Sequence, residues 1–428
     1  MSNQEIIRRE QYCQMIKEVT RSDEYLIVGI DIGKDKHHAF MGSATGKSLY
    51  RKLVFQNDLE GFSRLLKTVE QIKTQHGLSK VVFGVEPTGN YHKPLARYLI
   101  RCCHMVVMVT GQAVKYNRQI LDGRWDKNDT KDAANIADLV SRGKCIYYDF
   151  PSPNIMQLRA LIVLRRRLKR EEHGLRMRVR NNLLAQYFPE LDRFYSACER
   201  ESLAIVRWYL NPKTVAAFEF GEFFYLVTEK RRGIAQTQRL RKIHSLAEAS
   251  VGCPVKPAIE YEARLVVEKL LQVRDQIKKT DGFIADICFH IPEYSYLMSI
   301  PGFGPYVSAV VSAVIGDPSR FGNRRQLIKM AGFDLSASRS GKTSNRAIPV
   351  ISKKGNSELR YALYQAAQVA ATRVDLFRAY YTRILKGREG ERGIRTKMYV
   401  KLAAKMLVIA WTLMKRKESF NPAYLKTD

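Results

Sequence analysis

Short apolar runs alternate with helical patterns through the first 150 residues, and this order constrains the fold more than any other feature of the sequence. Apolar runs bounded by tight Gly-containing turns predict strands, and apolar residues spaced three and four apart predict helices. The elements predicted in this way are strands over 25–31, 37–42, 48–55, 80–86 and 105–110, and helices over 58–75, 92–102 and from 128 onward.

Three strands followed by helix, strand, helix, strand and helix is the order of a ribonuclease H-like domain. In such a mixed sheet the first and fourth strands are adjacent, and ligands gather beyond the strand ends. Asp31 ends the first predicted strand, Glu86 ends the fourth, and Asp129 and Asp132 begin the last helix. We therefore expect these four carboxylates to converge at one edge of the sheet.

The hexamer "NDTKDA", residues 128–133, contains two of these carboxylates. Side chains three residues apart on a helix are neighbours, so Asp129 and Asp132 repel each other unless a positive charge lies between them. One alternative is structural: Asn128 or Asp129 caps the helix, and Asp132 is stabilised in its first turn by the helix dipole. The other is a metal site, because oxygen ligands without His or Cys favour Mg²⁺ or Mn²⁺.

The chain is strongly basic, with 72 Lys and Arg against 42 Asp and Glu and a formal charge of +30. Nucleic acid is the expected partner for such a balance, and an anionic membrane surface is the alternative. The apolar stretch near the C-terminus contains Lys401 and Lys405 and fits an amphipathic helix, so no membrane span is predicted. No signal peptide is recognised, and the seven cysteines include no C-x-x-C pair, which argues against a disulfide framework or a zinc site.

From residue 151 the chain is predicted to be helical and very basic. Its excess of one charge sign favours phosphate contact over an ordinary solvated face. The stretch 263–287 has helical apolar spacing and is expected to pack as a coiled-coil arm or against a second subunit. The cations predicted to contact nucleic acid in the basic run are Arg159, Arg165, Arg166, Arg167, Lys169, Arg170, Arg176, Arg178 and Arg180.

The stretch "SIPGFGPYVSAVVSAV" begins at Ser299 and resembles a helix-hairpin-helix, in which glycines let backbone N–H groups approach a phosphate. An ordinary helix connection has the same pattern, so both interpretations stay open. A loop rich in Ser, Gly and basic residues follows. Its cations predicted to bind nucleic acid are Arg339, Lys342, Arg346, Lys353 and Lys354.

With these elements in order, the chain resembles the insertion-sequence transposases related to the Piv DNA invertase, the bridge-RNA-guided recombinases. The resemblance runs from about residue 25 to 415 and is carried by "GIDIGKDKH", "VEPTGNYHKPL", "NDTKDA", "SIPGFG", "RSGKTS" and "SKKGNSELRYALY". It implies that the four metal ligands are Asp31, Glu86, Asp129 and Asp132, and that Ser340 is the nucleophile. The residues alone do not distinguish Ser340 from its neighbours Ser336, Ser338, Thr343 and Ser344.

The resemblance also implies an architecture and partners. We expect an N-terminal extension (1–24), a RuvC-like domain (25–150), a basic helical and coiled-coil region (151–290) and a helical transposase domain (291–428). The implied partners are donor and target double-stranded DNA, a structured noncoding bridge RNA, and further copies of the chain as a homodimer that assembles into a tetramer. The implied location is the cytoplasm of a bacterial or archaeal cell, at the nucleoid.

The predicted function is therefore that of a DNA transposase or site-specific recombinase that cuts and rejoins DNA through a covalent phosphoserine, with Mg²⁺ or Mn²⁺ held by the carboxylates. One alternative is a RuvC-like Holliday-junction or ribonuclease H-like nuclease that hydrolyses with water. Another is an actin-like ATPase or sugar kinase, whose first phosphate loop "DIGKDK" fits loosely. Against this second alternative, no second phosphate loop of the Asp-Gly-Gly type appears downstream in the chain, and ATP chemistry does not require so many cations.

Overall fold

The computed structural model describes residues 3–121, 129–196, 200–229, 233–336 and 350–425. The chain divides into two compact units, Met1–Ser152 and Pro153–Asp428. The first is a mixed α/β unit and the second is almost entirely helical. The predicted subdivision of the second unit near residue 290 stays a prediction.

The N-terminal unit is built on a sheet with the strand order β3-β2-β1-β4-β5-β6. Strand β1 pairs antiparallel with β2 and parallel with β4, β4 pairs parallel with β5, and the outer pairs β2–β3 and β5–β6 are antiparallel. The predicted mixed sheet, with its first and fourth strands adjacent, is confirmed, and the order is consistent with a ribonuclease H-like domain. The strands are β1 (Tyr25–Asp31), β2 (Lys36–Ser43), β3 (Ser48–Gln56), β4 (Lys80–Val85), β5 (Met105–Met108) and β6 (Ile146–Tyr147).

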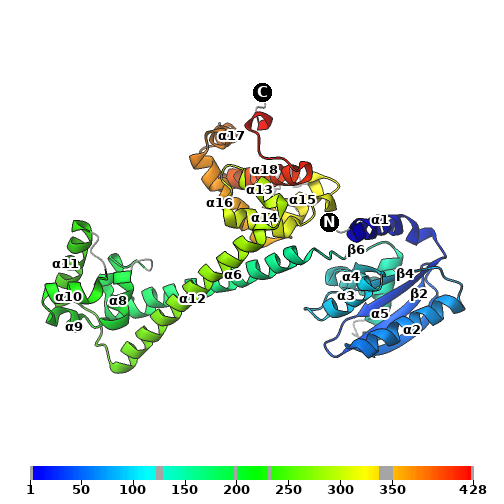
Figure 1. Cartoon of the computed structure of the whole chain (residues 1–428), viewed down its shortest axis with the longest axis horizontal. Helices are drawn as coiled ribbons and strands as arrows, with labels where there is room; N and C mark the ends of the chain where they lie inside the picture. Colours follow the sequence, from blue (N-terminus) through cyan, green and yellow to red (C-terminus); the bar gives the residue numbers. More distant parts are fainter. Residues whose placement is uncertain (1–2, 122–128, 197–199, 230–232, 337–349, 426–428) are drawn as a thin grey trace, which may run out of the picture. The chain divides into compact units, whose positions relative to one another are not determined.

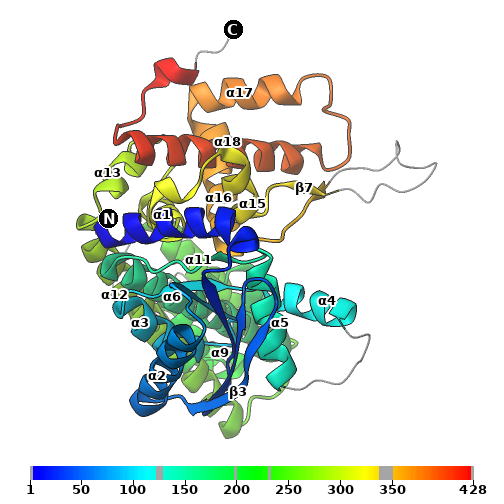
Figure 2. The ribbon, with the colours of Figure 1, turned by 90° about the vertical axis from the view of Figure 1, so that its right-hand side faces the viewer.

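Helices cover both faces of this sheet (Figure 2). Alternate residues of β1 point to opposite faces, as the pleat requires. Leu26, Val28 and Ile30 pack with α2 (Leu59–Gln75) and α3 (His92–Arg101). Tyr25 and Ile27 pack on the other face with α1 (Asn3–Glu18) and α5 (Asp129–Ser141). The sheet is therefore buried on both sides, and the two cores are separate.

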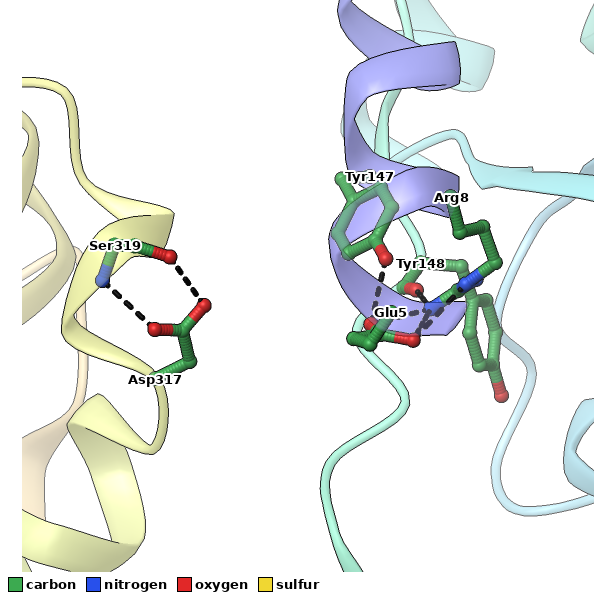
Figure 3. A network of polar contacts seen from close by, with 6 residues as sticks. All are labelled: Glu5, Arg8, Tyr147, Tyr148, Asp317 and Ser319. Atoms are coloured by element: carbon green, nitrogen blue, oxygen red, sulfur yellow. Dashed lines mark hydrogen bonds and ion pairs between the residues drawn. The ribbon is translucent and has the colours of Figure 1, made fainter. Parts of the chain in front are cut away.

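The N-terminal extension is part of this unit. Arg8 on α1 donates to the backbone oxygen of Tyr148 at 2.8 Å, and its guanidinium lies 4.6 Å from the ring centre of Tyr147 (Figure 3). The Tyr147 hydroxyl in turn donates to Glu5 at 2.5 Å. These contacts join the first helix to the last strand, so residues that precede the predicted domain complete its fold.

One helix was not predicted. The predicted order passed directly from the fifth strand to the helix of "NDTKDA", but α4 (Gly111–Leu121) lies between them. The fifth strand is correspondingly shorter than predicted and ends at Met108, and the Thr110 hydroxyl accepts from the Ala113 backbone N–H in the first turn of α4. Thr110, Gly111 and Gln112 separate the apolar run of the strand from the apolar residues of α4, so the sequence contained a boundary here that the prediction did not use.

Two long helices, α6 (Pro153–Arg178) and α12 (Pro257–Phe289), pair in the second unit (Figure 1). Arg165 pairs with Asp281 and Arg178 with Glu262, so the two helices run antiparallel. Apolar side chains pack at both ends of the pair and at its centre. The helical apolar spacing of 263–287 is therefore satisfied within the chain, by α6.

The other helical segments of this unit extend from the ends of the pair. Around one end lie η2 (Val179–Leu184), α7 (Ala185–Tyr187), η3 (Pro189–Arg193), α8 (Arg200–Trp208), α9 (Pro212–Ala217), α10 (Phe220–Val227) and α11 (Ile234–Glu248). Around the other lie α13 (Pro292–Met298), α14 (Pro305–Ile315), η4 (Pro318–Arg320), α15 (Arg324–Ala331), α16 (Ser357–Arg373), α17 (Asp375–Leu385), α18 (Ile394–Arg416) and η6 (Pro422–Leu425). A two-stranded sheet pairs β7 (Leu335–Ser336) with β8 (Val350–Ile351).

The hairpin between α13 and α14 packs inward. A Cβ on Gly302 would lie 2.9 Å from the Cβ of Ala370 on α16, and the φ of Gly302 is +94°. Ile300 and Phe303 beside it are buried. Gly302 therefore has a packing role, whereas Gly304 at the start of α14 has open space around it. Separately, none of the described helices is long and apolar enough to cross a membrane.

Candidate active site and nucleic-acid interface

Two of the predicted carboxylates lie at the ends of adjacent parallel strands. Asp31 is the last residue of β1, Glu86 directly follows β4, and both are half-buried. Residues two apart on a strand share a face. Asp31 is therefore on the same face as Ile27, and Glu86 on the same face as Val82, which is the face covered by α5. The expectation that these two strand ends share one edge is met.

Two glycines allow α5 to approach this face closely. Gly29 and Gly84 are paired across β1 and β4. A Cβ on Gly29 would lie 2.1 Å from the backbone oxygen of Ala133, and one on Gly84 would lie 2.6 Å from Val140. No larger residue fits at either place without moving the helix. Since Gly29 precedes Asp31 by two residues, the first turn of α5 reaches the level of the strand ends.

Asp132, in that first turn, is buried and has a positive partner. Only 3% of Asp132 is exposed. Nη2 of Arg118, on α4, donates to its Oδ1 at 2.5 Å. A buried carboxylate needs such a partner because its desolvation is otherwise uncompensated. Arg118 therefore supplies the positive charge that Asp132 requires.

A polar network holds α4 against α5 beside this ion pair. The Asn117 amide donates to Asn135 at 2.6 Å and to Asp138 at 2.8 Å. The Asn135 amide donates to the backbone oxygen of Val114 at 2.8 Å. Asn117 and Asn135 are both buried. Buried polar side chains with matched partners specify one arrangement, so the register of α4 on α5 positions Arg118.

Glu86 lies beside the other end of α4. A Cβ on Gly111, the first residue of that helix, would lie 2.6 Å from the Glu86 carboxylate oxygen Oε1. A helix N-terminus carries partial positive charge and favours a nearby carboxylate. Helix α4, which the sequence did not predict, thus contacts two of the four predicted metal ligands, Glu86 through its first residue and Asp132 through Arg118.

The carboxylates at this edge of the sheet have the donor atoms that a divalent cation prefers. Asp31, Glu86 and Asp132 offer only carboxylate oxygens, which suits Mg²⁺ or Mn²⁺. Among the residues that the structure describes, no three His, Cys, Asp or Glu side chains are grouped closely enough to hold a metal ion. Asp129 begins α5, but its side chain lies outside the described residues. The donor chemistry fits, and the metal centre itself stays a prediction.

The predicted nucleophile Ser340 lies outside the described residues, as do Arg339, Lys342 and Arg346. The chain on either side of them is tied together where β7 pairs with β8. The Ser352 hydroxyl donates to Asp334 at 2.5 Å across this base. Lys353 and Lys354, the two described cations of the predicted set, are exposed just after β8. The described residues that flank 337–349 are thus held next to each other in the helical unit.

Most cations of the predicted basic run have partners inside the second unit. Five pair with carboxylates, and Arg159 donates to the backbone oxygen of Ala313 at 2.7 Å. Arg167 and Arg170 are exposed and form no ion pair with any described residue. Arg176 is half-buried. The five ion pairs are Arg165–Asp281, Arg166–Glu358, Lys169–Glu172, Arg178–Glu262 and Arg180–Asp192.

A cluster of side chains links α6 to α14. The Arg165 guanidinium lies 3.9 Å from the ring centre of Tyr306, on α14, and the Tyr306 hydroxyl donates to Glu358 at 2.6 Å. Burial, together with the hydrogen bond to Glu358, raises the pKa of Tyr306 above its ordinary value. Glu358, in the first turn of α16, also pairs with Arg166 at 3.1 Å. Arg165 and Arg166 therefore stabilise the packing of the helical unit, and they are less available to contact phosphate than the sequence suggested.

Both halves of the chain are similar to known transposases. A DEDD-type transposase model matches residues 28–189, and the model of the transposase IS116/IS110/IS902 family matches residues 294–382. The insertion element IS116 uncharacterized 44.8 kDa protein of Streptomyces clavuligerus is 26% identical over 410 residues, 94% of this chain and 98% of that protein. The insertion element IS110 uncharacterized 43.6 kDa protein of Streptomyces coelicolor is 24% identical over 370 residues, 84% of this chain and 88% of that protein.

Proposed function

We propose that this chain, a transposase of the IS116/IS110/IS902 family, cuts and rejoins DNA with a carboxylate-held divalent cation and a serine nucleophile. The observation that carries the proposal is the joint placement of Asp31, Glu86 and the start of α5 at one edge of the sheet, where the glycine pair admits the helix. The transposase assignment also replaces the alternative of an actin-like ATPase or sugar kinase.

The proposed metal ligands are Asp31, Glu86, Asp129 and Asp132. Mg²⁺ or Mn²⁺ held there would neutralise charge on the transferring phosphoryl group and stabilise the leaving oxygen. Arg118 forms an ion pair with the buried Asp132 carboxylate in the free chain. Helix α4 orients both Glu86 and Arg118, so it has a positioning role for the edge as a whole.

The proposed nucleophile is Ser340. Its hydroxyl oxygen attacks the phosphorus, its proton passes to a nearby base, and the bond from phosphorus to a deoxyribose oxygen breaks as that oxygen takes up a proton. The product is a phosphoserine ester, which the hydroxyl of a second DNA end attacks in the reverse sense to rejoin the strand. The energy of the broken phosphodiester is conserved in the ester, so rejoining needs no nucleotide cofactor.

The test of this proposal is a covalent adduct. The full chain, incubated with Mg²⁺ and a labelled DNA that contains its element's ends, should yield a protein–DNA species that survives denaturing electrophoresis. Ser340→Ala should lose it and still bind DNA, while the matched variant Ser338→Ala should keep it. Cleaved DNA without any adduct would instead support the hydrolytic nuclease, and an adduct that persists in Ser340→Ala would assign the nucleophile to a neighbouring hydroxyl.

Sequence readout is proposed to come from a noncoding bridge RNA that pairs with donor and target DNA. The support is the charge of +30 without a recognisable helix-turn-helix or zinc-finger signature, which equips the chain for phosphate contact more than for base readout. The RNA is expected to bind the N-terminal unit and the basic run of α6. Site-specific recombination that survives complete ribonuclease treatment would refute this part and leave the metal and serine assignments intact.

The working assembly is proposed to be a homodimer that forms a tetramer on DNA in the cytoplasm. The support is a set of exposed apolar side chains along α6 and α12, which are Val163, Leu164, Tyr261, Leu265 and Phe283. Exposed apolar surface on paired helices favours association with another helix pair. Mass measurement by light scattering, with and without DNA, tests this, and a monomer in both conditions would refute it.

A further inference from the structure

A basic groove lies between α2 and α3, on the face of the sheet opposite α5. Its volume is about 680 Å³. The residues that line it and carry the following argument are Leu59, Phe62, Lys93, Arg97, Tyr98 and Arg101. None of them belongs to the proposed metal site, the serine loop or the basic run of α6. The groove is therefore separate from these sites.

The cations of the groove form a regular row. Lys93, Arg97 and Arg101 are four residues apart on α3, so successive ones are about 6 Å apart along the helix axis. All three are exposed, and none forms an ion pair with a residue that the structure describes. The opposite side of α3 is buried, through Leu95 and Leu99. This row differs from the basic run of α6, where most cations are neutralised within the chain.

Apolar side chains lie beside the cations. The rings of Phe62 and Tyr98 are 5.4 Å apart between centres. Leu59, in the first turn of α2, is 68% exposed although it is apolar. Duplex DNA offers mainly phosphates to such a surface, because its bases are stacked inside. An unpaired strand offers both phosphates and base faces, and single-strand sites combine cations with apolar or aromatic platforms in this way.

The groove begins at the edge of the sheet that carries the candidate active site. Strand β3 leads into α2, and strand β4 leads through Glu86 into α3. Both strands run in the same direction as β1, so both helices start at the edge where Asp31 lies. Asn90, which lines the groove, belongs to the same loop as Glu86. A strand in the groove can thus continue to the carboxylates by crossing this edge.

We propose that the groove between α2 and α3 holds an unpaired stretch of the DNA substrate, next to the phosphate that reacts. The row of three cations contacts successive phosphates, and Leu59 and Tyr98 contact bases without reading their identity. DNA is the partner that a transposase must open and cut, which is why the proposal commits to DNA. The proposal adds a binding surface to the proposed function and does not depend on Ser340 or on a guide RNA.

The test compares two triple variants of the full chain. Lys93→Gln with Arg97→Gln and Arg101→Gln removes the row. Lys52→Gln with Arg64→Gln and Lys67→Gln removes the same charge from exposed positions that do not line the groove. The probes are a labelled oligothymidylate of about 12 nucleotides, an oligouridylate of equal length and a duplex, measured by fluorescence anisotropy at about 0.2 M salt, where weak contacts are screened.

The groove triple should bind oligothymidylate about tenfold more weakly or worse, and its salt dependence should fall by about two in log–log slope for three lost phosphate contacts. The oligothymidylate affinity of the control triple should stay within about twofold of that of the native chain. In both triple variants, duplex affinity should change less than single-strand affinity. Leu59→Asn should weaken oligothymidylate binding without changing the salt slope, because it removes a base contact and no charge.

Three results would overturn the proposal. An equal loss in both triples would mean that only net charge matters. A loss confined to oligouridylate would assign the groove to RNA. Unchanged oligothymidylate binding in the groove triple, with an unchanged melting temperature, would leave the groove without a role in single-strand binding. Since none of these measurements involves cleavage, they are independent of whether the proposed serine chemistry is correct.

Discussion

Nη2 of Arg118 lies 2.5 Å from Oδ1 of Asp132, and this contact joins two helices that the sequence did not place together. The carboxylate side of the pair is almost fully buried, whereas 26% of the Arg118 side chain is exposed. An ion in the proposed metal site would compete with the guanidinium for the same oxygen. The pair is a structural contact of the free chain, and under the proposed function it would also influence metal binding.

Asp132→Asn is expected to abolish strand exchange and also to lower stability. The loss of activity follows from the loss of one anionic ligand, and the loss of stability, about 1–3 kcal/mol, follows from leaving Arg118 without its partner. Urea unfolding and a recombination assay measure the two effects. The double variant Arg118→Gln with Asp132→Asn should recover part of the stability and none of the activity. Recombination at the native rate in Asp132→Asn would refute the metal-site assignment.

Arg118→Gln alone is expected to raise the affinity for divalent cations. Removing the guanidinium frees the Asp132 oxygen and makes the site more negative. Titration with Mn²⁺, followed through the electron paramagnetic resonance signal of the free ion, reports binding without any need for turnover. The conservative control is Arg142→Gln, directly after α5, whose partner Asp138 is not a proposed ligand. Weaker Mn²⁺ binding in Arg118→Gln would show that Arg118 supports the site instead of competing for it.

Gly29→Ala is expected to destabilise the N-terminal unit by about 1–3 kcal/mol, because the new Cβ collides with the backbone of α5. The displaced helix should also reduce recombination. Gly282→Ala on α12 is a matched control with open space around its Cβ, and it should stabilise the chain by about 0.5–1 kcal/mol. Chemical denaturation of both variants checks the prediction, and equal stabilities would mean that α5 does not rest on Gly29.

Arg167→Gln with Arg170→Gln is expected to weaken duplex binding and to reduce its log–log salt slope by about two, because both cations are free to contact phosphates. Arg178→Gln with Arg180→Gln removes the same charge from residues that pair with Glu262 and Asp192. This control should change the slope less. A larger effect in the control would show that the ion pairs of α6 open when nucleic acid binds.

Acid is expected to destabilise the N-terminal unit. Burial lowers the pKa of His37, His92 and His104 below the ordinary value of 6.5. The unfolded chain therefore takes up protons near pH 6.5 while the folded unit does not, so stability is present above that pH and is lost as the pH falls toward the lower folded values. Hydrogen exchange in β1 and β4 at pH 7.5 and 5.5, corrected for the intrinsic rate, measures this loss.

His37 offers the control for the effect of pH. Its ring is fully buried between Phe55 and Phe62, at 5.2 Å and 6.3 Å between centres. His37→Leu removes one titrating group from apolar surroundings and should make the loss at pH 5.5 smaller. An unchanged acid response in this variant would assign the effect to other groups.

Local patterns in the sequence predicted the first five strands in their order along the chain and the positions of Asp31 and Glu86 at strand ends, but not the short strand β6. The adjacency of the first and fourth strands was expected from the likeness of this order to a ribonuclease H-like domain. Alternation of apolar residues depends on near neighbours along the chain, so it predicts elements and the residues at which they end. The same reasoning placed Asp132 in the first turn of its helix and found the basic run of α6. It missed α4, although Thr110, Gly111 and Gln112 mark a break after the apolar run of β5.

Tertiary structure alone decided which charges meet. Arg118 reaches Asp132 because α4 packs on α5, and the cations of α6 are largely neutralised because α12 returns antiparallel along it. On α3 the four-residue spacing of Lys93, Arg97 and Arg101 was not singled out from the sequence, and only the packing of α2 beside them forms a groove with an apolar wall. Partner choice between distant segments depends on how side chains pack in space, and local periodicity contains no information about it.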